Sequence, residues 1–276
     1  MNPAVRALAR AAMAARPVPL TDVRARAGLL APSDRGYLVP VEVFTAVAAE
    51  LTDRRRPGGA FVALCHNGRR WFSCRSVHYD TPDLRSFHDH RLGRGVRYSI
   101  REALCEDTGE RQFEIELTGG RGAPVTHRRP LLPGDAALGP APREFLASVL
   151  ERSYGIPVPE GLGRVLETDC TRATLVADGQ RLTCDAALRC RDVATGRTVR
   201  AEGGLVLVRT RTAGRPGETD RPGETDQPGE TDRLLGDHGV RAAEFTPYCG
   251  GLSALRPELA AHPSRQAVRA VFPTAG

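Results

Sequence analysis

The chain has 276 residues, of which 41% are hydrophobic and 26% are charged, a composition typical of ordinary soluble proteins. This length allows either one elaborated domain or two small ones. No run approaches the roughly 18 apolar residues that a membrane-spanning helix needs, and the N-terminal segment lacks the unbroken apolar stretch of a secretion signal. We therefore expect a cytoplasmic protein without a membrane span.

The basic residues are unusual because all 39 are arginine; the formal net charge is +6. A buried lysine can lose its proton, whereas a guanidinium stays charged and binds oxyanions as a planar fork. The sequence thus excludes any mechanism that needs a lysine and weakly favours anionic partners. Arginine codon bias in a GC-rich genome explains the same composition. Aromatic residues make up only 5% and are not interleaved with the arginines, so we expect no nucleic-acid-binding surface.

The cysteines point to neither a zinc site nor a disulfide framework. There are seven, an odd number, and no two form a C-x-x-C pair. We expect most of them to be small buried side chains in a reducing compartment.

In chain order, residues 1–32 form an alanine-rich leader that we expect to be helical or disordered. Residues 34–40 form a short apolar strand, and hydrophobic residues then recur at helical spacing from Val41 to Leu51. After a Pro-Gly-Gly turn the pattern changes to short β-rich segments separated by turn residues. Strands are predicted at residues 61–66, 71–80, 96–106 and 111–120.

The last of these strands alternates strictly between two kinds of side chain. Residues 113, 115 and 117 are apolar, and residues 112, 114 and 116 are Gln, Glu and Glu. In a barrel, a charged inner face would create a polar lumen. A solvent-exposed outer face explains the same alternation.

The second half of the chain again contains a predicted helix and short predicted strands. A helix is predicted at residues 142–154, and strands are predicted at residues 171–178, 181–192 and 203–212. Strands joined by hairpin-like turns, with helices at intervals, predict an α+β fold that is mainly antiparallel β. We expect a closed sheet with flanking helices rather than a βαβ arrangement.

Residues 215–232 contain a six-residue repeat, RPGETD, RPGETD, QPGETD. Units of Gly, Pro and acids cannot bury enough apolar area to fold, so residues 213–233 are predicted to form a disordered surface insertion. Slippage in a GC-rich gene explains the repeat, and we assign it no function.

Histidines and aspartates gather between residues 78 and 90, which permits a metal-site interpretation. We favour the alternative that residues 80–83 form a turn and a helix cap. No G-x-S-x-G motif and no P-loop occur, so acyl transfer and Walker-type ATPase chemistry have no support.

The segment SVHYDTPDLRSFHDHRLGRGVRYSIRE (76–102) resembles the signature of the VTC domain, the catalytic module of polyphosphate polymerases in the triphosphate-tunnel (CYTH-like) superfamily. Other landmarks follow in the family's order: DRGYLVP, RQFEIELTGGRG, TRATLVADGQRLTCDAAL, GLVLVRTRT and EFTPYCGGLSAL. The resemblance covers nearly the whole chain. It implies an eight-stranded antiparallel tunnel barrel over residues 33–260, followed by a tail at residues 261–276.

Catalytic members of this family bind a nucleoside triphosphate and a divalent metal, Mn or Mg, and transfer the terminal phosphoryl group to polyphosphate. Phosphoryl transfer needs mainly positioning and charge stabilisation, which converging cations and a carboxylate-held metal supply. The resemblance implies that the phosphate-binding residues are Arg97, Arg101, Arg172, Arg181 and Arg211. It implies that Glu114 and Asp185 assist the metal.

Other positions depart from the family pattern. Family lysines correspond to Gly36, Ser99 and Glu116, an arginine–tyrosine pair corresponds to Asp169 and Cys170, and a metal-binding glutamate corresponds to Arg209. A carboxylate at Glu116 or Asp169 reverses the local sign in a phosphate tunnel, and Arg209 repels a cation.

Three hypotheses follow. The chain is an active VTC-type phosphotransferase with an all-arginine tunnel, a pseudoenzyme that holds polyphosphate or a nucleotide without turnover, or a scaffold without a phosphate ligand. We expect the polymerase activity to be reduced or lost.

Overall fold

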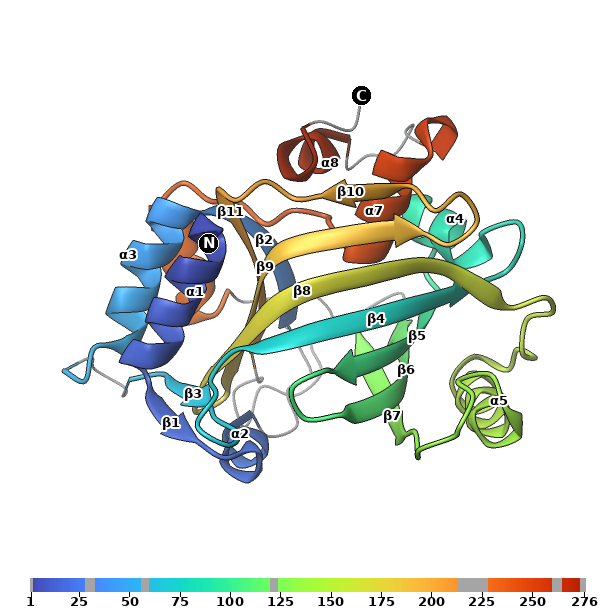
Figure 1. Ribbon diagram of the computed structural model, residues 1–276, viewed down its shortest axis with the longest axis horizontal. Helices are drawn as coiled ribbons and strands as arrows, with labels where there is room; N and C mark the ends of the chain where they lie inside the picture. Colours follow the sequence, from blue (N-terminus) through green and yellow to red (C-terminus); the bar gives the residue numbers. More distant parts are fainter. Residues whose placement is uncertain are drawn as a thin grey trace.

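The computed structural model describes residues 2–27, 33–55, 60–119, 124–212, 228–259 and 265–273. Its central feature is an antiparallel sheet (Figure 1). The strands are β2 (Ser33–Pro40), β4 (Phe72–Asp80), β5 (Arg97–Cys105), β6 (Glu110–Thr118), β7 (Val125–Pro130), β8 (Gly163–Ala177), β9 (Gln180–Asp192) and β11 (Leu205–Thr212). Their order is β2-β11-β9-β8-β4-β5-β6-β7. The short strands β1 (Arg16–Val18), β3 (Val62–Leu64) and β10 (Thr198–Arg200) pair at its margins.

The sheet curls strongly toward one face. Strands β11 and β6 lie five places apart in the strand order, which in a flat sheet would separate them by roughly 24 Å. Yet the guanidinium of Arg209 on β11 lies 3.1 Å from the carboxylate of Glu116 on β6. The face that carries these two side chains is therefore the inner face of a half-barrel.

The half-barrel differs from the closed ring that the sequence predicted. Among the described residues, no strand pairing joins β2 to β7. The outer edge of β2 is instead occupied by an extended segment, since Tyr37 bridges Ala242 and the amide of Ala243 donates to the Gly36 carbonyl at 2.8 Å. The backbone groups that β7 would need are thus already partly used. The predicted fold class, α+β and mainly antiparallel with flanking helices, is confirmed.

One half of the outer face is covered by α1 (Pro3–Ala14) and α3 (Val41–Thr52), which lie side by side at the left of Figure 1. Their apolar side chains form one core with outward residues of β8, β9 and β11, such as Leu175, Leu182 and Val208. Leu8 of α1 is fully buried there. Helix α1 therefore packs into the same core as the sheet, and the division of the chain at residue 32 remains a prediction.

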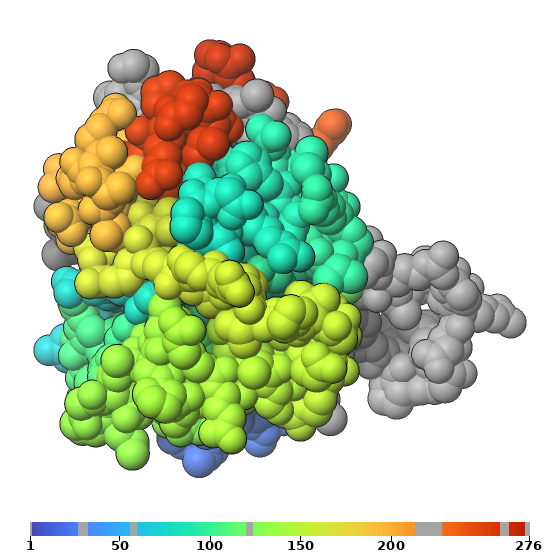
Figure 2. All heavy atoms as spheres, turned by 90° about the vertical axis from the view of Figure 1, so that its right-hand side faces the viewer, coloured from blue at the N-terminus to red at the C-terminus, as the bar shows by residue number. Residues whose placement is uncertain are grey.

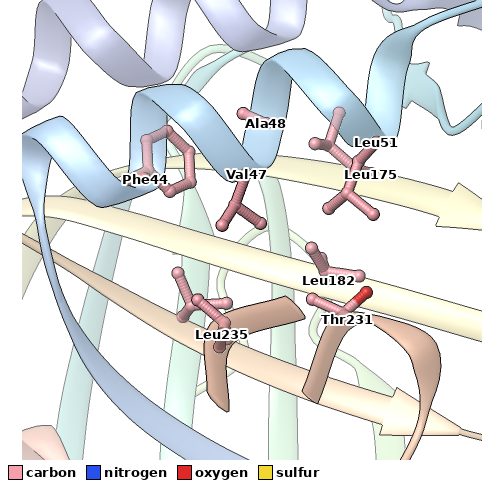
Figure 3. Close-up of a pocket in the computed structure, with 9 residues that line it drawn as sticks. Phe44, Val47, Ala48, Leu51, Leu175, Leu182, Thr231 and Leu235 are labelled. Carbon is pink, nitrogen blue, oxygen red and sulfur yellow. The ribbon is translucent and has the colours of Figure 1, made fainter. Parts of the chain in front are cut away.

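A small apolar pocket lies in this outer layer, between α3, the sheet and α6 (Glu230–Asp237). Figure 3 shows its lining side chains, including Phe44, Val47 and Leu235, gathered between the helices and the strands. The only polar residue that lines it is Thr231. The pocket therefore lies on the opposite side of the sheet from the charged inner face.

The other half of the outer face is covered by α5 (Pro140–Tyr154). Phe113 and Ile115 of β6 are fully buried and share a core with Leu146 and Leu150 of this helix. The helix stops at Gly155, which adopts a left-handed conformation (φ 63°) that suits glycine. The apolar side of the alternating strand thus faces outward under a helix, and its glutamates face inward.

Helices also close the two ends of the half-barrel. Helix α2 (Leu20–Ala27) packs at one end through Val23 against Val62 and Val176. At the other end α4 (Arg85–Arg91) contacts α7 (Pro247–Leu255), with the 3-10 turn η1 (Pro257–Leu259) and α8 (Arg265–Val271) beyond. Figure 2 shows the α4 and α7 regions adjacent on this surface, in teal and red.

The predicted cap at residues 80–83 is confirmed in its main feature. The carboxylate of Asp80 accepts hydrogen bonds from the backbone amides of Ser86 and Phe87 at 3.0 Å, in the first turn of α4. It also accepts one from the hydroxyl of Tyr248 at 2.5 Å, which joins α4 to α7. Asp80 is therefore a structural residue.

Only the end of the repeat insertion lies within the described residues. Residues 213–227 lie outside the described residues. The end of the third repeat departs from the prediction, because Glu230–Asp232 begin α6 and Asp232 is buried. No helix in the described part of the chain is long and apolar enough to cross a membrane.

Candidate functional site

The candidate site is the inner face of the half-barrel, where alternation along the strands places a set of charged side chains. On this face Arg211 pairs in register with Asp34 and with Arg181, and Asp185 pairs with Arg172. On the far strands Glu114 lies between Arg101 and Arg128. The charged inner-face residues are Asp34, Arg97, Arg101, Glu114, Glu116, Arg128, Arg172, Arg181, Asp185, Arg209 and Arg211. Arginines outnumber carboxylates, so this face is electropositive.

Glu114 is held by an arginine on each side. Arg101 donates from Nε to one carboxylate oxygen at 2.7 Å, and Arg128 donates from Nε to the other at 2.7 Å. Burial alone would raise the pKa of Glu114, but the two guanidiniums outweigh it and lower that pKa to about 2. Glu114 is therefore a carboxylate at every physiological pH.

Asp185 forms a bidentate ion pair with Arg172. The Nε and Nη2 atoms of Arg172 donate to the two carboxylate oxygens at 2.6 and 2.7 Å. Burial opposes charge on this arginine, but Asp185 overcomes it and raises the pKa of Arg172. Such parallel guanidinium–carboxylate bonds fix both side chains in one orientation.

Arg209 and Arg211 share two carboxylates. Asp34 accepts from Nε of Arg209 at 2.6 Å and from Nε of Arg211 at 2.7 Å, one on each oxygen. Glu116 accepts from the two Nη atoms of Arg209 at 3.1 Å. Burial would raise the pKa of Glu116, but Arg209 and its neighbours lower it to about 2.

The Arg209–Glu116 pair changes how two departures from the family pattern are understood. Each was expected to disturb the tunnel alone, Glu116 by repelling phosphate and Arg209 by repelling a cation. In the structure the reversed charges neutralise each other across the half-barrel. Asp169 does not face the inner side at all: it pairs with Arg75 and Arg189 on the opposite face of β8, so the expected sign reversal there is wrong.

Arg181 differs from these arginines because no described residue serves as its counterion. Its Nε atom is buried and lacks a hydrogen-bond partner in the described part of the chain. Burial and the guanidiniums of Arg128, Arg211 and Arg172 lower the pKa of Arg181 to about 10. A buried cation among other cations is an unfavourable arrangement unless an anion is added.

The remaining predicted arginine, Arg97, lies toward the α4 end of the face. Its Nε atom is also buried without a partner in the described residues. Burial and then the charge of Arg97 lower the pKa of the nearby His90. The five predicted phosphate ligands therefore divide into three with counterions (Arg101, Arg172 and Arg211) and two with a buried Nε that lacks a partner (Arg97 and Arg181).

The predicted metal ligands do not fit a divalent metal. Both oxygens of Glu114 and both oxygens of Asp185 already accept hydrogen bonds from guanidiniums. Within the described ranges, no group of three or more His, Cys, Asp or Glu side chains could hold a metal ion. This also applies to the cluster between residues 78 and 90, where burial lowers the pKa of His78 to about 3 and its ring stacks on Tyr248.

Sequence reasoning missed two members of the site. Asp34 was passed over although it lies two residues before Gly36, a position assigned to the tunnel, and so shares its face. Arg128 has no predicted role because β7, the strand that carries it, is not predicted from the sequence. The alternation in VTHRRP was too short to reveal which of its two arginines faces inward.

Comparison with known proteins gives a likeness in fold. The chain matches a candidate adenylate cyclase from Bacillus halodurans with a TM-score of 0.41 and 14% identity, over 69% of this chain and 84% of that one. It matches a candidate adenylyl cyclase from Hippeastrum with a dominant triphosphatase activity, with a TM-score of 0.42 and 12% identity, over 80% of this chain and 94% of that one. A conserved hypothetical protein from Pyrococcus furiosus has a TM-score of 0.42 and 12% identity, over 78% and 96%.

No protein-family model matches the chain, and no curated protein matches its sequence. These structural similarities do not establish the activity of the chain, which is therefore inferred from its own residues.

Proposed function

We propose that the chain binds triphosphate-class anions, either a nucleoside triphosphate or the end of a polyphosphate chain, on the inner face of its half-barrel. We further propose that it is a divergent triphosphate-tunnel protein related to the VTC-type polyphosphate polymerases, with their metal-dependent phosphoryl transfer reduced or lost. The resemblance of residues 76–102 to the VTC signature supports the family, and the charges of the inner face support the ligand.

The observation that carries this proposal is Arg181. Arg181 is half-buried beside Arg128, Arg172 and Arg211, its Nε atom is buried without a hydrogen-bond partner, and it has no counterion among the described residues, which weakens the folded protein in the absence of a ligand. A polyanion would supply both the missing charge and the missing hydrogen-bond acceptor. Phosphate oxygens suit this role because guanidiniums bind them with paired, charge-assisted hydrogen bonds.

The reduced activity follows from the surroundings of the carboxylates. Metal-assisted phosphoryl transfer needs carboxylate oxygens that hold the metal beside the phosphates. On this face those oxygens are bound to arginines, and Arg209 stands at a position that the family gives to a glutamate. The chain also has no lysine to take over a proton or a phosphate contact.

Thermal unfolding with sodium tripolyphosphate, ATP and long-chain polyphosphate tests the proposal. At about 100 times the Kd, we expect an anion to raise the Tm of the wild type by roughly 5 °C or more. The Arg181→Gln variant should lose most of this shift, yet melt no lower than the wild type without anion, because it no longer buries an unpaired charge. Arg152→Gln, an exposed change of equal charge on α5, should behave like the wild type.

The proposal fails if no phosphate compound shifts the wild-type Tm, or if Arg181→Gln responds as strongly as Arg152→Gln. The same wild-type protein, incubated with ATP and Mn²⁺, should form no polyphosphate above the level of a protein-free blank. Polymer formation would contradict the loss of activity while leaving the binding claim intact.

A further inference from the structure

We infer that the inner face takes its phosphate ligand in the metal-free form, so that Mg²⁺ and Mn²⁺ compete with the protein for the ligand instead of assisting its binding. This rests on the proposed function and specifies the chemical form of its ligand. The evidence for it is the set of arginine–carboxylate pairs that lines the inner face.

Four carboxylates of the described inner face, Asp34, Glu114, Glu116 and Asp185, have both of their oxygens bound to guanidinium groups. For Asp34 the donors are Arg209 and Arg211, and for Glu114 they are Arg101 and Arg128. For Glu116 both donors belong to Arg209, and for Asp185 both belong to Arg172. The donor atoms lie between 2.6 and 3.1 Å from the oxygens in these bonds.

A divalent cation would have to compete with these guanidiniums for the carboxylates. Each oxygen keeps a second lone pair, but a Mg²⁺ ion bound there at about 2.0–2.1 Å would lie beside the positive charge of the arginines, which repels it. The carboxylates are strongly buried, Asp34 with 4% and Glu114 with 9% of the side chain exposed, so water would screen this repulsion poorly.

The ligand itself changes when it carries a metal. Mg²⁺ binds the oxygens of neighbouring phosphates and cancels two of their negative charges. The metal would compete for the same oxygens and charges with Arg128, Arg172, Arg181 and Arg211. In return, the four described carboxylates named above are already paired with arginines. Losing one charge-assisted hydrogen bond lowers affinity by roughly tenfold. The metal-bound anion should therefore bind at least that much more weakly.

Isothermal titration calorimetry with sodium tripolyphosphate tests this directly on the full chain. One titration contains EDTA, and the other contains Mg²⁺ in excess over the anion at the same ionic strength. We expect a Kd that is about tenfold or more higher with Mg²⁺. An equal or lower Kd with Mg²⁺ would overturn the inference while leaving the proposed anion binding in place. Absence of binding in both titrations would overturn the proposed function and the inference together.

A second measurement concerns the metal alone and is independent of the anion. Arg209→Gln would remove both guanidinium hydrogen bonds to Glu116 and one to Asp34, which leaves Glu116 with only long contacts at 3.5 Å from Arg211 and Thr126. Electron paramagnetic resonance of Mn²⁺ should show no ion bound to the wild type and an ion bound to this variant. Arg189→Gln, which loosens Asp169 on the outer face while Arg75 still holds it, is the control and should bind none. Mn²⁺ bound by the wild type at the same affinity as by Arg209→Gln would contradict the account.

Discussion

Arg209 and Glu116 lie on strands far apart in the sequence, and the effect of each on the charge of the inner face can be understood only when both are considered together. Taken singly, each reverses a charge expected in a phosphate tunnel. Taken as a pair at 3.1 Å, they close an ion-pair network that also includes Asp34 and Arg211. Among the described residues, Arg97 and Arg181 have no counterion, and Arg181, which pairs in register with Arg211, is the residue on which the proposed ligand binding depends.

The buried ion pairs predict a dependence of stability on pH. The pKa of Glu114 is 4.5 in a free side chain and about 2 in the folded protein, so its pairing stabilises the protein above pH 4.5 and is lost as the pH falls toward 2. Glu114→Gln should therefore cost about 2–3 kcal/mol at pH 7. In urea unfolding, this difference from the wild type should shrink steadily below pH 4.5.

The matched control for this experiment is Glu151→Gln on the exposed side of α5, which should leave the free energy of unfolding unchanged at every pH. If the decrease in the free energy of unfolding caused by Glu114→Gln stays constant from pH 7 to pH 3, it results from altered packing and not from the lost charge.

At the residue scale, alternation along a strand predicted which side chains share a face, but neither which face points inward nor what the side chains contact. Alternation in β6 placed Glu114 and Glu116 on one face, because a strand's side chains point alternately to its two sides. The partners of Glu116 come from β11, far along the chain, and depend on how strongly the sheet curls. No local pattern carries that information. For the same reason, sequence alone did not reveal that both oxygens of Glu114 accept hydrogen bonds from arginines.

At the element scale, helix α6 shows how a low-complexity repeat joins the fold. Asp232, in the last repeat unit, accepts hydrogen bonds from the hydroxyls of Tyr37 at 2.9 Å and Thr210 at 2.6 Å. Its second oxygen accepts from the amide of Gly229 at 2.8 Å, which caps the helix. One side chain therefore joins α6 to both β2 and β11.

Removing this carboxylate should destabilise the protein strongly. In Asp232→Ala, two buried hydroxyls and a backbone amide lose their acceptor, and we expect a cost of about 2–4 kcal/mol in the free energy of unfolding. Asp237→Ala, an exposed change at the end of the same helix, should cost almost nothing. Equal effects of the two variants in urea unfolding would refute the anchoring role of Asp232.

Elements were predictable where their periodicity was long. The strands around β4, β5 and β6 and the helices α3 and α5 were all expected near their observed positions. Composition misled at the third repeat, because a Gly-Glu-Thr-Asp unit reads as disordered until Tyr37 and Thr210 provide partners for its aspartate. Strand β7 was missed because its sequence, VTHRRP, contains a single β-branched apolar residue and therefore shows no apolar alternation.

At the scale of the whole molecule, the two faces of the sheet differ in the side chains that they carry. The outer face builds the apolar cores under α1, α3 and α5, while the inner face collects arginines and their counterions. The predicted antiparallel architecture holds, whereas the predicted closure does not, because residues 242–243 occupy the edge of β2. An irregular segment that pairs with a sheet edge through its backbone needs no regular pattern of apolar residues. Its pairing could therefore not be predicted from the sequence.

A crystal structure of the protein with tripolyphosphate, grown in EDTA, tests the central claim most directly. We predict phosphate oxygens on the inner face, within about 3 Å of the Arg181 guanidinium, with the carboxylate–arginine pairs around it still formed. An anion bound only outside the half-barrel, or an Arg181 that stays without a partner at saturating tripolyphosphate, would contradict the account.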